Sequence, residues 1–118
     1  RHSSREDLKV AQSLFEKKHY AYCLFFCHLA VEKEIKRIYL IRRKKIPPFI
    51  HNLVRIADDC NLQLEEPFRQ NLLELNTFNI KARYEIIKAK FHKKATKSYT
   101  QKWLNQTTQI LDQLKKVK

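Results

Sequence analysis

The chain carries a compact group of charges at Glu32, Lys33 and Lys36 that could hold a ligand. Glu32 precedes Lys36 by four residues, so an α-helix would place both on one face, in the favourable order for an ion pair worth a few tenths of a kcal/mol. Such a pair is commonly solvent-exposed surface. The same lysines could also bind an anion, and the residues alone leave both interpretations open.

A second polar pair, Asn79 and Arg83, interrupts an apolar stripe of Leu, Ala and Ile at helical spacing. A buried carboxamide needs hydrogen-bond partners, and a polar residue in a helical seam often fixes register or a dimer contact. Arg83 follows one turn later, and a guanidinium suits forked contacts with phosphate or carboxylate. The alternative is that Arg83 extends from the helices to a nearby glutamate.

His51 comes shortly after two consecutive prolines and marks the start of a predicted short helix. A lone histidine at such a position is most often a cap or a surface residue. We therefore expect His51 to have a structural role, in which it ties the loop to the neighbouring helix.

The remaining reactive side chains favour neither a metal nor a catalytic centre. Cys23, Cys27 and His28 lie close in sequence, but a structural zinc site needs four ligands and the surrounding residues are apolar. The two cysteines are one helical turn apart and are expected in the core, as in a protein of the reducing cytoplasm. The chain has no glycine, which excludes a glycine-rich phosphate loop. We predict no catalytic residue, metal or cofactor.

Composition predicts a single domain over residues 1–118 with a strongly basic surface. There are 25 Lys and Arg against 12 Asp and Glu, which gives a net charge of +13. Such a charge attracts nucleic acid, a nucleotide or an acidic partner, in a salt-dependent way. No apolar run is long enough to span a membrane. The chain has no Met, so we expect its native start to be missing.

Apolar residues at helical spacing predict the elements that must position these groups. Ser3 and Glu6 form a capping-box pattern before a helix that reaches about Lys18. Four further helices are expected: 20–44, a short one at 49–60, one that opens at 65–67 and continues through 86, and a last one that includes 103–117, after a polar loop at 93–97. The prediction is an all-α fold, an antiparallel up-and-down four-helix bundle with an additional short helix.

Three short motifs in this arrangement resemble the HEPN family. They are Ala30-Val31-Glu32-Lys33 with Lys36, then His51-Asn52-Leu53, and then Ala82-Arg83-Tyr84. The resemblance extends over residues 5–117 in helix order and length. It implies a homodimer that binds nucleotide and often acts beside a minimal nucleotidyltransferase, in pairs that include toxin–antitoxin systems. The ligand-binding residues expected are Glu32, Lys33, Lys36, His51, Asn79, Arg83 and Tyr84.

The ribonucleases of this family carry an arginine followed, after four to six residues, by a histidine. No arginine of this chain has a histidine at that spacing, since eight residues separate Arg83 from His92. A continuous helix would place them about 13 Å apart along its axis. The leading interpretation is therefore a non-catalytic HEPN domain that binds a nucleotide or another anion and serves a nucleotidyltransferase. A divergent metal-independent ribonuclease that acts on RNA and a helical protein-interaction module are the alternatives.

Overall fold

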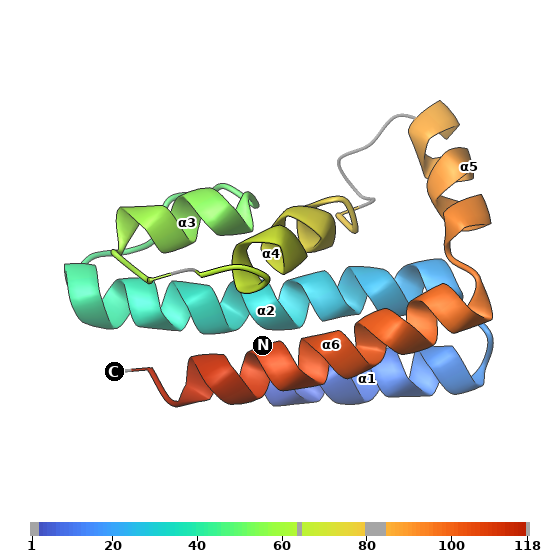
Figure 1. Cartoon of the computed structure of the whole chain (residues 1–118), viewed down its shortest axis with the longest axis horizontal. Helices are drawn as coiled ribbons and strands as arrows, with labels where there is room; N and C mark the ends of the chain where they lie inside the picture. Colours follow the sequence, from blue (N-terminus) through green and yellow to red (C-terminus); the bar gives the residue numbers. More distant parts are fainter. Residues whose placement is uncertain (1–2, 64, 80–84, 118) are drawn as a thin grey trace.

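The computed structural model describes residues 3–63, 65–79 and 85–117, except for the side chains of residues 85–87. All regular structure in these residues is helical, which confirms the all-α prediction. The helices are α1 (Ser4–Glu16), α2 (Tyr20–Arg43), α3 (Leu53–Asp59), α4 (Phe68–Asn76), α5 (Glu85–Lys94) and α6 (Lys97–Lys115). Figure 1 shows α1, α2 and α6 side by side, with α3 and α4 on the opposite side of α2 from α1.

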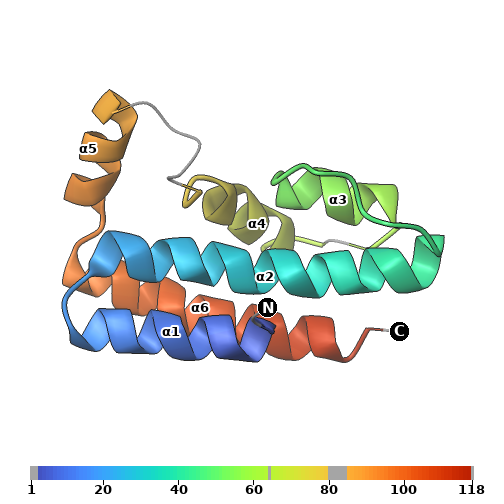
Figure 2. The same cartoon turned by 180° about the vertical axis from the view of Figure 1, so that it is seen from behind.

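The long helix α2 is the centre of the fold, because it contacts all five other described helices. Figure 2, seen from behind, shows the same arrangement, with α2 between α1 and the pair α3 and α4. Its core side chains include Leu24, Val31 and Ile35, which are fully buried. The helix ends at Arg43, one residue before the predicted end, because Lys44 adopts a left-handed conformation (φ 54°) and Pro47 and Pro48 follow.

Local side-chain caps set several of the other helix boundaries. The predicted capping box of α1 is present, with Ser3 and Glu6 each accepting a hydrogen bond of 3.2 Å from the other's backbone. The helix α3 begins at Leu53, later than predicted, because Asn52 accepts a hydrogen bond from the Arg55 N–H and so caps it. Beyond its end, Asn61 has a φ of 57°, which supports the predicted stop at this residue.

The prediction of one helix from 65–67 through 86 is wrong, since α4 ends at Asn76 and α5 starts at Glu85. Asn76 accepts a hydrogen bond of 2.8 Å from the Leu53 N–H, which anchors the end of α4 to the start of α3. Phe78 is fully buried against the rings of Phe91, Tyr99 and Trp103, after the chain has left the helix. The bundle is therefore less regular than predicted, and α5 projects away from it in both views.

The aromatic cluster around Phe78 should dominate stability at this end of the molecule. Phe78→Ala removes a fully buried ring and should lower the free energy of unfolding by about 3–5 kcal/mol. Phe49→Ala is the matched control, because its ring is 99% exposed and makes no core contact. Urea unfolding of both variants is the measurement, and equal losses would contradict the assignment of Phe78 to the core.

Candidate anion-binding site

The carboxylate of Glu32 lies at the centre of a polar network on α2, and the residue is only 7% exposed. One oxygen, Oε1, accepts a hydrogen bond of 2.9 Å from Nδ1 of His51. The other, Oε2, accepts one of 2.9 Å from Nζ of Lys36. The pair of Glu32 and Lys36 is thus partly buried, unlike a solvated surface pair, and His51 joins it from the loop before α3.

His28 is the member of this network that sequence reasoning missed. Its ring is fully buried one turn before Glu32, and Nε2 donates to the His51 carbonyl oxygen at 3.2 Å. The same nitrogen is 3.7 Å from the Glu32 carboxylate. The signal was in the sequence, because His28, Glu32 and Lys36 follow one another at spacings of four and so share a helix face.

Burial and hydrogen bonding have opposite effects on the pKa values of His28 and Glu32. Burial lowers the pKa of His28, so this imidazole resists protonation. Burial alone would raise the pKa of Glu32, but hydrogen bonds from His51 and Lys36 outweigh it and hold the pKa below its usual value. The network therefore combines a neutral buried imidazole with an ionised carboxylate at neutral pH.

Two of the predicted lysines, Lys33 and Lys36, line a cavity of about 560 Å³ that we name the cation cavity. Arg37 lies on the same wall, and the start of α1 contributes Ser3 and Ser4. The rest of the lining is largely apolar, with Leu40 on α2 and Ile46, Pro47, Pro48 and Phe49 on the loop that follows it. Cationic groups and apolar or aromatic side chains thus line the same cavity.

Each cation of this cavity already contacts a carboxylate. Nζ of Lys33 is 2.7 Å from the carboxylate of Asp7, and Nε of Arg37 is 3.0 Å from that of Glu34. Lys36 is paired with Glu32, as described above. The carboxylates are buried, whereas the side chains of the three cations keep between 24% and 39% of their surface exposed. A ligand in the cavity therefore meets the cations first, in positions that the buried acids hold in place.

The other predicted site residues do not join this cavity in the described structure. Asn79 lies beyond the end of α4 and is half-buried, so the helical seam predicted for it is wrong. Arg83 and Tyr84 lie outside the described residues, and their predicted role is not tested. His92, on α5, packs against the Tyr22 ring with centroids 6.0 Å apart.

The cysteines behave as core residues. All three thiols are free and buried, and the pKa of Cys27 is raised by its hydrogen bond with Cys23 and by burial. Within the described part of the chain, no group of three or more His, Cys, Asp or Glu residues is placed to hold a metal ion. No described helix has the length and apolar character that crossing a membrane requires.

The all-helical architecture of the described residues agrees with one family. Residues 2–117 match the model of the HEPN domain, and the chain therefore belongs to the HEPN family. No curated protein and no solved structure matches the chain significantly.

The buried imidazole of His28 should make stability sensitive to mild acid. Below the usual histidine pKa of about 6.5, the unfolded chain binds a proton at His28 that the folded chain excludes, so stability falls as pH falls. His28→Gln keeps a donor for the His51 carbonyl but cannot titrate. Its free energy of unfolding should decline less than that of the parent between about pH 7 and pH 5.

Urea unfolding at several pH values measures this difference. His19→Gln is the matched control, because it removes a histidine that is exposed in the folded chain. Parallel pH profiles for the parent and His28→Gln would contradict the prediction.

Proposed function

We propose that this HEPN domain binds a nucleotide or a related phosphate-bearing anion without cleaving it, and that it does so in the cation cavity. The observation that carries the proposal is that Lys33, Lys36 and Arg37 line one cavity together with apolar side chains and the exposed ring of Phe49. Phosphate binds ammonium and guanidinium groups, and a base stacks on an aromatic ring. The cavity offers both kinds of contact a few side chains apart.

Two features make the cavity a better binding site than a free lysine cluster. The buried carboxylates hold the cations in place, so less side-chain entropy is lost when a ligand binds. In addition, α1 begins at the cavity wall, and a helix N-terminus carries partial positive charge. The same acids reduce the net charge, so we expect moderate affinity that weakens with salt.

The proposal favours binding over cleavage because the chain lacks the arginine-to-histidine spacing of the family's ribonucleases. The imidazole of His51 belongs to the network around Glu32, but its Nδ1 is bound to Glu32 and the residue does not line the cavity. Cleavage without a metal needs a proton acceptor and a cation within hydrogen-bond reach of one phosphodiester. Among the described residues, the lining of the cavity includes no imidazole, and the carboxylates beside its cations are already paired with them.

ATP binding should depend on the lysine that belongs to both the network and the cavity. Lys36→Ala should weaken binding by about 1–3 kcal/mol, the range for a hydrogen bond to a charged group. Phe49→Ala should also weaken it, without loss of stability, because its ring is exposed. Lys97→Ala, an exposed lysine at the start of α6, should have no effect. Isothermal titration at low and raised salt is the measurement.

Two results would contradict this account of the cavity. One is an unchanged affinity in Lys36→Ala, with folding verified by circular dichroism. The other is the absence of ATP binding to the parent at low salt. Chelator-resistant cleavage of labelled single-stranded RNA would instead favour the alternative of a divergent ribonuclease. Arg83→Ala provides a further comparison, because the family resemblance implies that Arg83 and Tyr84 also bind the ligand, and this variant should then weaken ATP binding as well.

We further propose that the domain is a homodimer that serves a minimal nucleotidyltransferase. HEPN domains often dimerise. Large apolar side chains on α2 and α4 support this proposal, because Tyr22, Ile41 and Leu73 are about half exposed in the single chain. The surplus of positive charge would favour an acidic surface on the partner.

The assembly is tested by light scattering across micromolar concentrations. We expect a mass twice that of one chain, because a second copy would cover apolar surface that water now contacts. Ile41→Asp on α2 and Leu73→Asp on α4 identify the helix in the contact. The variant whose aspartate would be buried between the two copies should have the mass of a single chain. A single-chain mass for the parent at all concentrations would disprove the dimer.

A further inference from the structure

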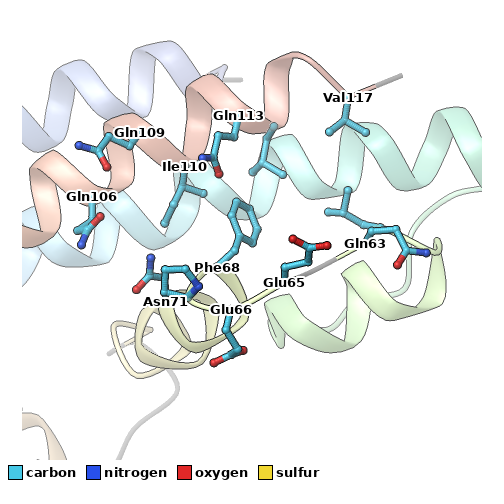
Figure 3. A pocket seen from close by; sticks show the side chains of 13 residues that line it. Gln63, Glu65, Glu66, Phe68, Asn71, Gln106, Gln109, Ile110, Gln113 and Val117 are labelled. Atoms are coloured by element: carbon cyan, nitrogen blue, oxygen red, sulfur yellow. The ribbon is translucent and has the colours of Figure 1, made fainter.

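A second cavity, of about 460 Å³, lies between α6 and the segment that leads from α3 into α4. Figure 3 shows Gln106 and Gln113 on α6, with Glu65 and Asn71 on the other side of the opening. Apolar side chains such as Phe68 and Ile110 form its floor. We name it the amide cavity, and no residue of it belongs to the cation cavity.

The lining of the amide cavity is unusual for so basic a chain. None of its lining residues, all of them in the described part of the chain, is Lys, Arg or His. Glu65 and Glu66 are its only charged groups, and both are exposed. Phosphate is therefore a poor ligand for this cavity, because no cation or imidazole faces it and two carboxylates would repel it.

The carboxamides of α6 are the second distinctive feature. Gln106, Gln109 and Gln113 recur at spacings of three and four, so they follow one face of the helix. Their side-chain amides make no hydrogen bond to other described residues, whereas the side chain of Gln101 on the same helix donates to that of Asn105. Each carboxamide offers both a donor and an acceptor, which is what the backbone of an extended peptide needs.

We propose that the amide cavity binds an extended peptide segment of a partner protein that alternates basic and apolar side chains. In an extended strand, successive side chains point to opposite faces. One face of the peptide would place apolar groups on the floor around Phe68 and Ile110. The other face would place lysine or arginine near Glu65 and Glu66, while the glutamines of α6 bind its backbone.

Charge complementarity favours a basic peptide over an acidic peptide or a nucleic acid in the amide cavity. An acidic peptide or a nucleic acid would meet two carboxylates and no cation. The proposal is independent of nucleotide binding, because the two cavities share no residue. ATP titration therefore tests one cavity, and peptide titration tests the other.

The probe is a short synthetic peptide that alternates Lys and Val, and its matched control alternates Glu and Val. The Lys-Val peptide should bind at low salt and shift the side-chain amide resonances of Gln106, Gln109 and Gln113 in ¹⁵N spectra. Glu65→Gln combined with Glu66→Gln should weaken binding about twofold to tenfold, the range for exposed ion pairs. Glu16→Gln, an exposed glutamate on α1, should leave it unchanged.

Gln109→Ala should weaken binding of the Lys-Val peptide, whereas Gln12→Ala, an exposed glutamine on α1, should not. The proposal is overturned if the Lys-Val peptide does not bind, or if the Glu-Val peptide binds equally well. It is also overturned if spermidine shifts the same resonances with equal affinity, because the cavity would then recognise charge alone. Resonances of the amide cavity that change with protein concentration, before any peptide is added, would assign it to a second copy of the chain and overturn the proposal.

Discussion

The burial of α2 on several sides is the constraint on which the rest of the structure depends. The helix contacts all five other described helices, yet its sequence places His28, Glu32 and Glu34 among its buried residues. A buried charge or imidazole must find partners inside the protein, since leaving it unpaired costs several kcal/mol. The charged face of α2 therefore determines what must pack against it.

The partners come from three different parts of the chain. His51 reaches Glu32 from the loop before α3, Lys36 closes the other side of the same carboxylate, and Ser4 of α1 donates to Glu34 at 2.6 Å. These contacts set the course of the loop that carries Phe49 and bring it beside the cations of α2. The cation cavity is thus a consequence of the hydrogen bonds and ion pairs that Glu32 and Glu34 make with neighbouring segments.

The bounds of α1 and α2 could be predicted from the sequence, because the residues that start and end these helices act locally. A capping box, a proline pair and apolar spacing predicted the start of α1 and both ends of α2, and the structure agrees to within one residue. Such signals act within a turn or two of helix and need no knowledge of the rest of the molecule. The link between Glu32 and Lys36 was accessible for the same reason, since four residues separate them on one helix face.

The break between α4 and α5, the depth of Glu32 and the role of His28 were decided by tertiary structure. Apolar spacing continued past Asn76, but the fit of Phe78 among three aromatic rings outweighed helix continuation. The sequence by itself determined the all-helical character of the fold, the bounds of α1 and α2, the excess of positive charge and the residues of the α2 face. Which charges are buried, and which cavities they line, depended on contacts between distant segments, because burial is a property of packing and not of local sequence.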